Sequence, residues 1–379
     1  MRALFSSTAG AGHFTPMVPL AHACRAAGHD VAVAAPASFA ATVARAGLEH
    51  LPFADVPAEQ MGAVFSRLPD LPLDEANAVV IREVFAGLDA RAALPGLDAI
   101  VRSWRPDVIV RDPAEFASYV VAERHAVPHA SVAIGPAALE DFMLSLVDEP
   151  MRDLGATHGS DDLRAAPVLS LVPAILDGPR ADGIPLVRLR YDTAPVADDD
   201  LPAWGDADAP LVYASFGTVA ASLGPFAGIY AATVAALADH PVRVLVTVGD
   251  SGDPTAFEPL PANVRVERFR PQQAVMPAAS AVIGHGGFGT TMTALAHGVP
   301  LVVVPLFSFD QHVNAAAVAD AGAGVALDGG PAATDRLADA LDAVLTDGAF
   351  AAGARRVADE IAGLPPVAAG VDVLVGISG

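Results

Sequence analysis

A glycine-rich segment in the second half of the chain has the residue types of an anion-binding site. Glycine lets the main chain approach a ligand closely, and the free N–H groups at the start of a helix carry partial positive charge. Hydroxyl side chains there can cap the helix or donate to the ligand. The sequence therefore predicts a pyrophosphate site that needs no metal ion, formed by Gly284, His285, Gly286, Gly287, Phe288, Gly289, Thr290 and Thr291.

A second polar cluster follows the next apolar run, residues 301–304. Because strand ends of a parallel sheet open into one cleft, we expect the side chains of Asp310 and Gln311 to reach the same ligand. A carboxylate beside an amide offers acceptors and donors that suit sugar hydroxyls. Asp310 can also be the N-cap of a helix that contains Asn314, and the two roles are compatible.

A histidine, His13, follows the first apolar run and precedes Pro16, which starts a helix. Gly10 and Gly12 lack the third glycine of a dinucleotide-binding fingerprint, so this loop does not predict a nicotinamide site. An imidazole with a near-neutral pKa can take the proton of a hydroxyl that attacks a substrate. Taken alone, His13 could equally be structural, but beside the glycine-rich segment a general base is the better hypothesis.

A general base needs a carboxylate that sets its tautomer, and residues 105–115 hold three candidates. Asp112 ends the predicted strand 108–110 and is our choice, although Asp107 and Glu115 are close in sequence. An aspartate that precedes a proline commonly serves a turn, so Asp112 also has a structural alternative.

Short β-rich runs alternate with alanine-rich helical stretches, which predicts an α/β fold with parallel sheets covered by helices on both faces. The pattern breaks between residues 180 and 210 and then resumes. We expect two Rossmann-like domains, 1–195 and 196–365, whose sheets face a central cleft, and a C-terminal segment, 366–379, that can pack back on the first. The expected strands are residues 3–7, 31–34, 108–110, 129–132, 211–215, 242–246, 264–266, 281–283 and 301–304, and the expected first helices are residues 19–27 and 36–46.

The composition excludes several classes of function. All 22 basic residues are arginines, so chemistry that needs a lysine amine, such as a Schiff base with pyridoxal phosphate, is excluded. The net charge of −22 argues against nucleic acid as a partner, because phosphates are bound by basic faces. The single cysteine, Cys24, argues against a disulfide framework, predicts a cytoplasmic protein and is expected to be buried on the first helix. The N-terminus does not resemble a signal sequence, and glycine and proline interrupt the charge-free interval 271–309, so no membrane span is predicted.

The motifs together resemble the signature of family 1 glycosyltransferases, which have the GT-B fold. The stretch His285-Gly-Gly-Phe-Gly-Thr, followed by Asp310-Gln311, matches the family's donor site, and the Gly-His-x-x-Pro stretch around His13 matches its general base. The resemblance implies direct displacement at the anomeric carbon with inversion, in which His13, oriented by Asp112, deprotonates the acceptor.

The same resemblance implies further contacts with a nucleoside diphosphate sugar. Phe269 falls where the family stacks an aromatic ring on the base, Arg270 where the main chain meets the base edge, and Gln272 near the ribose. Thr218 falls where charge on the departing diphosphate is taken up. Plant members carry a glutamate for the ribose hydroxyls where this chain has Thr293, and that departure suits a deoxyribose donor.

Among its relatives, the sequence most resembles bacterial enzymes that attach deoxysugars to antibiotics, and these generally use thymidine diphosphate (dTDP) sugars. The acceptor is then a small, largely apolar polyketide or aromatic compound. We expect its site in the less regular parts of the first domain, residues 52–94 and 136–164, with contacts from Phe65, Phe85, Phe142, Met143 and Leu146.

Three other functions are weighed against the transferase. A nucleotide-sugar epimerase uses the same scaffold without an apolar acceptor site, but it does not carry the Gly-His-x-x-Pro start. A non-catalytic homologue that activates a partner transferase would ordinarily have lost His13 or the Asp310-Gln311 pair, which are present. A dehydrogenase is disfavoured by the missing fingerprint. The residues leave open the sugar, the acceptor, O- or C-linkage, dTDP or UDP, a monomer or homodimer, and the need for an activator.

Overall fold

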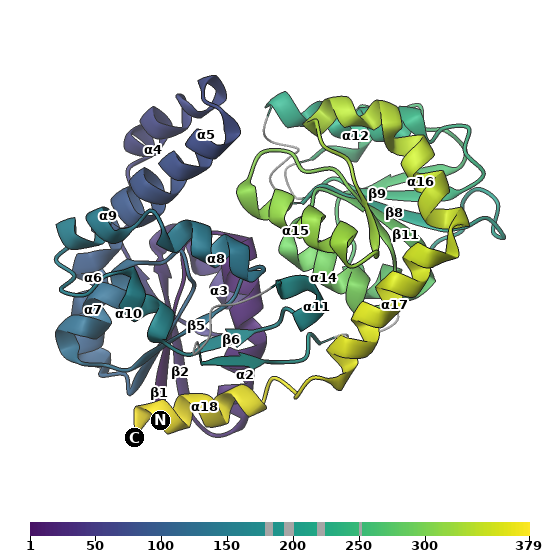
Figure 1. The fold of residues 1–379 in the computed structure, drawn as a ribbon. Helices are drawn as coiled ribbons and strands as arrows, with labels where there is room; N and C mark the ends of the chain where they lie inside the picture. The colour runs from purple at the N-terminus through teal and green to yellow at the C-terminus, as the bar shows by residue number, and fades with distance from the viewer. Residues whose placement is uncertain (179–184, 193–200, 218–223, 250–251) are drawn as a thin grey trace. The chain divides into compact units, whose positions relative to one another are not determined.

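The computed structural model describes residues 1–178, 185–192, 201–217, 224–249 and 252–379. The chain divides into two compact units, each built on its own parallel sheet (Figure 1). Unit 1 consists of Met1–Val172, Asp177–Arg190 and Leu364–Gly379, and unit 2 of Pro173–Leu176 and Tyr191–Gly363. Each unit is an α/β structure, as predicted from the alternating pattern.

The described residues of unit 1 form a seven-stranded sheet in the order β3-β2-β1-β4-β5-β6-β7. Every neighbouring pair is parallel, and the register places Phe5 between Val33 and Val110. The inner strands are almost wholly buried, because helices cover both faces of such a sheet. The strands are β1 Arg2–Ser6, β2 Asp30–Pro36, β3 Glu49–Phe53, β4 Val108–Arg111, β5 His129–Val132, β6 Val168–Ser170 and β7 Leu186–Arg188.

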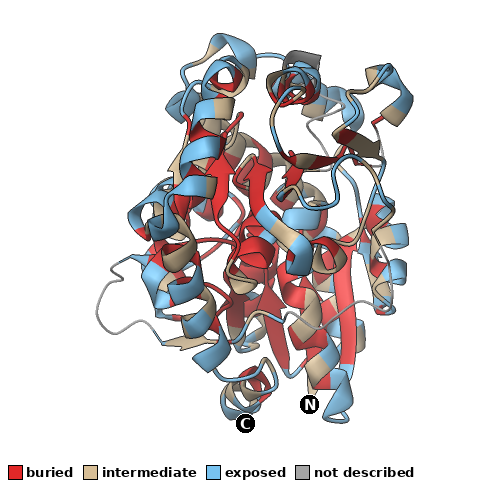
Figure 2. Ribbon diagram, turned by 90° about the vertical axis from the view of Figure 1, so that its right-hand side faces the viewer, coloured by how far each residue is buried: buried red, intermediate tan, exposed pale blue. Residues whose placement is uncertain are grey.

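Buried residues gather on the strands at the centre, and the outer sides of the helices carry exposed residues (Figure 2). Three consecutive segments, α5, the π-helix η4 and α6, follow each other without a break. The helical segments are α1 Ala11–Phe14, η1 Thr15–Met17, α2 Val18–Ala26, η2 Ala37–Phe39, α3 Ala40–Arg45, α4 Ala58–Phe65, η3 Leu68–Asp70, α5 Leu73–Val79, η4 Val80–Asp89, α6 Ala90–Trp104, α7 Ala117–His125, α8 Ala137–Leu144, α9 Asp148–Asp153, α10 Ser160–Ala165 and α18 Ala369–Ser378, with α11 Ala174–Asp177 spanning the boundary of the units.

The last helix, α18, belongs to unit 1 and packs on α2 and β4. Gly370 allows the close approach, because a Cβ at that position would lie 3.0 Å from Leu20 Cδ1 and 2.9 Å from Leu189 Cδ1. Helix α2, the predicted helix at residues 19–27, buries Cys24 completely, as predicted, and burial raises the pKa of its thiol to about 11. Cys24 is therefore a small core residue.

The described residues of unit 2 form a six-stranded sheet in the order β10-β9-β8-β11-β12-β13, again with parallel neighbours. The strands are β8 Leu211–Ser215, β9 Arg243–Thr247, β10 Val264–Glu267, β11 Ala279–Gly284, β12 Leu301–Val303 and β13 Gly324–Ala326. The helical segments are α12 Gly224–Ala236, η6 Pro254–Phe257, α13 Gln272–Val275, η7 Met276–Ala278, α14 Phe288–Ala296, α15 Phe309–Asp320, η8 Gly330–Arg336, α16 Leu337–Thr346 and α17 Gly348–Gly363.

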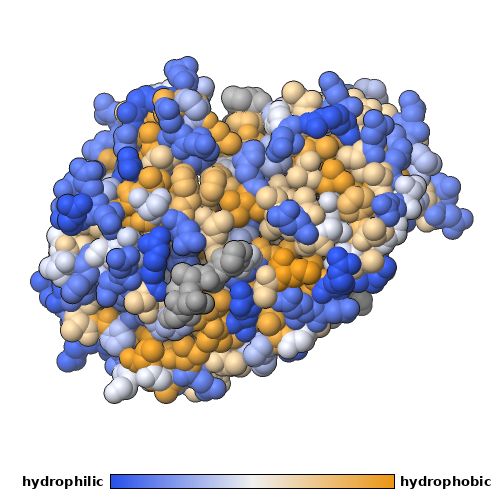
Figure 3. All heavy atoms as spheres, in the orientation of Figure 1, coloured by the Kyte–Doolittle hydropathy of each residue, from blue (hydrophilic) through white to orange (hydrophobic). Residues whose placement is uncertain are grey.

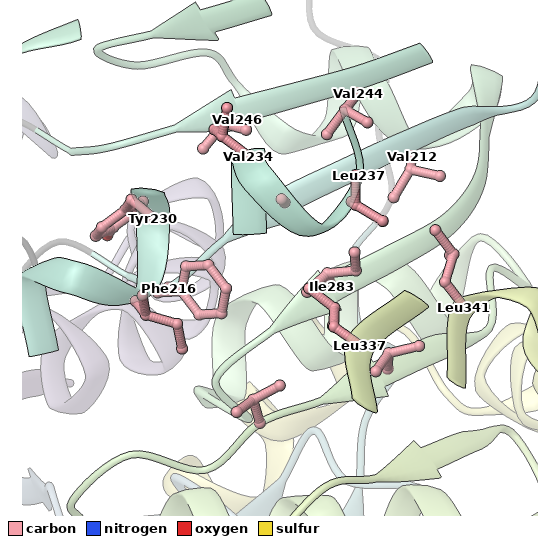
Figure 4. Close-up of a cluster of buried hydrophobic side chains, with 14 of the residues drawn as sticks. Val212, Phe216, Tyr230, Val234, Leu237, Val244, Val246, Ile283, Leu337 and Leu341 are labelled. Atoms are coloured by element: carbon pink, nitrogen blue, oxygen red, sulfur yellow. The ribbon is translucent and has the colours of Figure 1, made fainter. Parts of the chain in front are cut away.

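The core of unit 2 lies between this sheet and the helices α12 and α16 (Figure 4). Val212, Val244 and Ile283 project from neighbouring strands toward Leu237 at the end of α12 and Leu341 on α16, and all five side chains are fully buried. Removing such aliphatic and aromatic surface from water is the main favourable term in folding.

All nine predicted strands are present, with ends shifted by at most two residues. The sequence did not predict β3, β6, β7 and β13, which are short or, in β3, contain a proline. The prediction that residues 52–94 and 136–164 are less regular was wrong, because both stretches are largely helical. Their helices are short and interrupted, which weakens a 3.6-residue pattern in the sequence.

Strand order reverses at one point in each sheet, between β1 and β4 in unit 1 and between β8 and β11 in unit 2. In an open parallel sheet, ligands bind outside the carboxyl ends of the strands at this point. The loops after β1 and β4 carry His13 and Asp112, and the loop after β11 carries His285. The topology therefore places the predicted base and the predicted phosphate-binding loop at the two switch points.

Hydrophobic and hydrophilic residues are interspersed on the face shown in Figure 3. Large apolar side chains that are exposed include Phe65, at 49%, and Phe269, at 66%. Within the described ranges, no helix combines the length and the apolar character needed to cross a bilayer.

Candidate active site

The loop after β1 fixes the position of His13. Gly10 precedes the short helix α1, and its carbonyl accepts hydrogen bonds from the main-chain N–H of His13 and of Phe14, at 3.1 and 3.0 Å. The imidazole lies so close to Gly10 that a Cβ there would be 2.6 Å from His13 Cδ2. Any other residue at position 10 would push the ring away, so the glycine sets its orientation.

The predicted partner of His13 is in contact with it: Nδ1 lies 3.0 Å from Oδ1 of Asp112. Asp112 is fully buried and also accepts hydrogen bonds from the N–H of Ala114 and from the N–H and hydroxyl of Thr8. Burial alone would raise the pKa of Asp112, but the charge of His13 and these hydrogen bonds outweigh it and lower the pKa. An ionised Asp112 holds the proton on Nδ1, so the lone pair of His13 is on Nε2.

The two other carboxylates of this segment have different roles. Asp107 accepts a hydrogen bond from the main-chain N–H of Arg2, at the start of β1. Glu115 accepts from the hydroxyl of Ser6, at 2.8 Å, and from the main-chain N–H of Ser118, at 3.1 Å, which ties β1 to the start of α7. Neither is hydrogen-bonded to His13 among the described residues, so the structure brings only Asp112 of the three candidates into that contact.

A pocket of about 240 Å³ lies at the carboxyl ends of β1, β2 and β3 in unit 1. Phe85 of η4 forms part of its wall and packs against His13, with ring centroids 5.3 Å apart. The pocket is lined by Thr8, Ala9, Pro36, Ser38, Phe53, Ala54, Asp55, Val56, Ala58, Met61, Phe85, Asp89, Ala93 and Glu115. Mostly apolar walls with a few polar groups are typical of small-molecule sites.

Of the five side chains proposed for the acceptor, this pocket contains only Phe85. Phe65 is half exposed on α4, whereas Met143 is buried in α8. Phe142 and Leu146 are partly exposed and do not line the pocket. Sequence reasoning missed Asp89, four residues after Phe85, although that spacing on a helix was the available signal.

In unit 2, the glycine-rich segment joins β11 to α14 through a tightly packed loop. Gly286 has φ +86, and a Cβ there would lie 2.6 Å from the carbonyl oxygen of Gln311, so only glycine fits. The amide of the buried Asn314 donates to the carbonyl of Gly286 at 2.7 Å. The loop is thus held by α15.

His285 lies between two glycines. A Cβ at Gly217 would lie 2.9 Å from His285 Nε2, and a Cβ at Gly287 would lie 2.5 Å from the same atom. Burial lowers the pKa of His285, and smaller contributions from Asp310 and the main chain of Ser215 oppose it. Its Nδ1 atom is buried and has no hydrogen-bond partner among the described residues. Such an orphan atom is the feature expected where a ligand supplies the missing partner.

The helix α14 begins directly after the loop, with Gly287 at the N-cap and no side chain capping it. Thr290 does not cap this helix, because it lies in the first turn and its hydroxyl accepts a hydrogen bond from the Gln272 amide at 2.8 Å. Gly289 is exposed, and nothing lies within 4 Å of where its Cβ would be. The start of the helix is therefore open to an anion.

Thr293, one turn further along α14, is buried and fully engaged. Its hydroxyl donates to the carbonyl of Gly289 at 2.7 Å and lies 3.0 Å from the hydroxyl of Tyr191. Tyr191 is the first residue of the long segment of unit 2. It was not singled out from the sequence, because it lies in an irregular stretch.

The Asp310-Gln311 pair has two different environments. Gln311 is buried, and its side-chain carbonyl accepts from the main-chain N–H of Leu306, at 2.8 Å, and of Phe307, at 3.2 Å. It therefore shapes the loop after β12. The N-cap of α15 is Ser308, so the alternative in which Asp310 caps that helix was wrong; Asp310 lies in its first turn and is partly exposed.

The residues expected near the base follow β10. Phe269 exposes 66% of its surface, which is unusual for an aromatic side chain that has no ligand. The guanidinium of Arg270 forms an ion pair with Glu267, at 2.8 Å between Nε and Oε2, so this side chain binds within the protein. Thr218, predicted near the diphosphate, lies outside the described residues. In the described part of the chain, no three His, Cys, Asp or Glu side chains gather as a metal site would require.

Comparisons with known proteins agree across both units. A family model described as erythromycin biosynthesis protein CIII-like, N-terminal domain, matches residues 22–191, and the corresponding C-terminal domain model matches residues 231–375. The 4′-demethylrebeccamycin synthase of Lentzea aerocolonigenes is 32% identical over 99% of each chain. The L-demethylnoviosyl transferase of Streptomyces niveus is 32% identical over 96% of this chain and 95% of the relative.

Solved structures show the same similarity over the whole length. The glycosyltransferase SnogD from Streptomyces nogalater is 29% identical, with a TM-score of 0.75, and the match covers 100% of this chain and 99% of SnogD. The spinosyn rhamnosyltransferase SpnG complexed with thymidine diphosphate is 27% identical, with a TM-score of 0.78, over 99% of this chain and 100% of SpnG.

Proposed function

Since the chain belongs to the EryCIII-like glycosyltransferases, which have the GT-B fold, we propose that it transfers a deoxysugar from a dTDP-sugar to a hydroxyl of a small apolar natural product, with inversion. The observation that carries this proposal is the His13–Asp112 pair beside an apolar pocket. A base oriented by a buried carboxylate is what an attacking hydroxyl needs.

In the proposed reaction, Nε2 of His13 takes the proton of the acceptor hydroxyl as its oxygen attacks the anomeric carbon. The bond between that carbon and the diphosphate oxygen breaks, and the electron pair leaves with the diphosphate. Asp112 stabilises the imidazolium that forms, because its carboxylate lies 3.0 Å from Nδ1. The reaction requires that the base of unit 1 and the anion site of unit 2 act on the same pair of substrates.

The leaving diphosphate is assigned to the start of α14. Open main-chain N–H groups and the helix dipole stabilise negative charge there without a formal positive charge. The orphan Nδ1 of His285 can donate a hydrogen bond to a phosphate oxygen when its proton is on that nitrogen. Such preorganised donors stabilise charge that develops in the transition state.

The choice of dTDP rests on two supports. Thr293 presents no carboxylate to a ribose hydroxyl, and its own hydroxyl is engaged with Gly289 and Tyr191. Among similar proteins, one is named TDP-daunosamine transferase and SpnG was solved with thymidine diphosphate. The exposed ring of Phe269 is assigned to stack on the base, since every nucleobase offers a flat face.

The test uses the purified chain with a dTDP-deoxysugar and a panel of hydroxyanthraquinones and macrolactones, with release of dTDP measured by chromatography. His13→Ala should lower turnover by about a thousandfold or more, because the general base is lost. Its affinity for dTDP, measured by calorimetry, should stay within about twofold of wild type. The matched control is His22→Ala, since His22 is an exposed histidine on α2.

Two further measurements test the details. Calorimetry with thymidine, uridine and guanosine diphosphates identifies the base, and the anomeric proton coupling of the product shows inversion or retention. Unchanged turnover in His13→Ala would overturn the role of the base. Tight dTDP binding without any transfer would instead favour a non-catalytic homologue that activates a partner.

A further inference from the structure

Three carboxyl groups line the pocket of unit 1, those of Asp55, Asp89 and Glu115, and the proposed reaction uses none of them. Asp89 is the last residue of η4 and is partly buried. Among the described residues, no group donates a hydrogen bond to it or forms an ion pair with it. Its oxygens are not among the buried atoms that lack a partner, so a molecule in the pocket can reach them and supply a hydrogen bond.

The other two acids that line the pocket are satisfied by the chain itself. Asp55 accepts hydrogen bonds from the main-chain N–H and the hydroxyl of Ser38. Glu115 accepts from Ser6 and from the main chain at the start of α7. Asp89 is thus distinguished from its neighbours by its vacant acceptor positions and not by its charge.

The surroundings of Asp89 make its ionised form costly in the absence of a ligand. Burial is the main reason that its pKa rises to about 6. The carboxylates of Glu115 and Asp112 raise the pKa further, and His13 opposes them. No arginine or histidine lines the pocket, and the two hydroxyl groups that do, those of Thr8 and Ser38, donate to other groups, so a bound molecule can donate to Asp89 without displacing a protein partner.

Asp89 is also placed next to the base. It lies four residues after Phe85 on η4, and both side chains line the pocket. The Phe85 ring packs on His13, so an acceptor that touches Asp89 lies close to the imidazole. The η4 segment is a π-helix, and π-helical turns occur frequently at functional sites.

We propose that Asp89 is an acceptor-binding residue whose carboxylate takes a hydrogen bond from a donor group on the acceptor, and so orients the hydroxyl that His13 deprotonates. This inference rests on the proposed function. The donor group is a second hydroxyl or an ammonium. An acceptor with a carboxylate at that place is repelled, because no basic side chain of the pocket compensates it.

The experiment compares Asp89→Asn with the wild-type chain on four hydroxyanthraquinones. These share the hydroxyl to be glycosylated and differ in one further substituent, a hydroxyl, an aminomethyl, a methoxy or a carboxylate group. Acceptor affinity is measured by fluorescence without donor, and KM values are measured for acceptor and donor separately. Asp74→Asn is the control, since Asp74 is an exposed carboxylate on the adjoining helix α5.

For the hydroxyl and aminomethyl acceptors, Asp89→Asn should weaken binding and raise the acceptor KM by about 10- to 100-fold. The KM of the donor and the affinity for the methoxy acceptor should change by less than about threefold, which a general structural defect would not produce. The carboxylate acceptor should bind the variant better than the wild type. The substituent, hydroxyl or ammonium, whose acceptor loses more affinity in Asp89→Asn identifies the group that donates the hydrogen bond in the natural acceptor.

Equal affinities of variant and wild type for all four acceptors would overturn the inference and leave the transferase untouched. If acceptor binding depends on Asp89 but the wild type transfers no sugar, the proposed function fails, and of the inference only the binding of the ligand by Asp89 remains. Asp89→Ala serves as a second variant, and thermal unfolding shows that both are folded.

Discussion

The two candidate sites lie at equivalent switch points of two parallel sheets, yet different chemical groups form them. In unit 1, the groups that matter are ionisable side chains, and Asp112 holds His13 through a 3.0 Å contact. In unit 2, they are main-chain groups around Gly286 and Gly287, with a neutral imidazole between glycines. The same topology therefore supports two kinds of recognition.

The difference fits the roles that we propose for the two sites. Moving a proton requires a group whose charge changes during the reaction, so its partners must be carboxylates that fix its tautomer and charge. Holding a diphosphate requires many donors at short range, and glycines permit the main chain to supply them. The glycine-rich segment itself supplies no basic side chain, since residues 271–309 contain neither lysine nor arginine.

The largest effect is expected from breaking the ionisable site alone. Asp112→Asn should lower kcat by roughly a thousandfold or more, because an amide cannot stabilise the imidazolium or hold the Nδ1 proton in the same way. The affinity for dTDP, measured by calorimetry, should remain within about twofold. Asp107→Asn is the control, since Asp107 only caps the start of β1. Equal loss in the two variants would contradict the role of Asp112.

A smaller effect, on the affinity for dTDP, is expected when the unit 2 site loses the exposed ring of Phe269. Phe269→Ala should weaken dTDP binding by roughly 5- to 100-fold, the range found for stacking of one base on an aromatic ring. Thermal stability should hardly change, because 66% of Phe269 is exposed. Phe65→Ala removes an equally large, half-exposed ring from unit 1 and should leave the dTDP affinity as it is. If both substitutions weaken dTDP binding alike, Phe269 has no specific contact with the base.

The smallest effect is expected on the stability of the chain. It depends on pH, because it comes from Asp89, an ionisable group of the unit 1 site. The folded pKa of Asp89, about 6, lies above its ordinary value, so the folded state is favoured below about pH 4 and this advantage is lost as pH rises to 6. At pH 8, Asp89→Asn should therefore raise the free energy of unfolding by about 1 to 3 kcal/mol more than it does at pH 4. Urea denaturation at both pH values measures this. A gain of the same size at both would show that ionisation is not the cause.

Much of the fold follows from local patterns in the sequence. The short β-rich runs at residues 211–215 and 129–132 predicted β8 and β5 to the residue. β3 was missed because Glu-His-Leu-Pro-Phe has neither an apolar run nor an alternation, and only its pairing with β2 makes it a strand. The family was also inferred correctly, because its motifs lie in short, contiguous segments.

The candidate site was predictable where a role depends on the main chain and less so where it depends on packing. The demand for glycine at position 286 could be anticipated, whereas its cause, the carbonyl of Gln311, comes from another helix. Of the three acids within residues 107–115, the sequence favoured Asp112, because it ends the predicted strand, and the strand register indeed brings it to His13. Asp89 carries no motif at all.

The order of residues by itself determined the parallel α/β architecture, the glycine-rich loop before α14 and the histidine after the first strand, because each depends on neighbours along the chain. The tertiary structure alone decided which side chains line the pocket and which polar atoms have no partner among the described residues. Those properties depend on distances between segments far apart in sequence, and such distances exist only once the sheets have formed and packed.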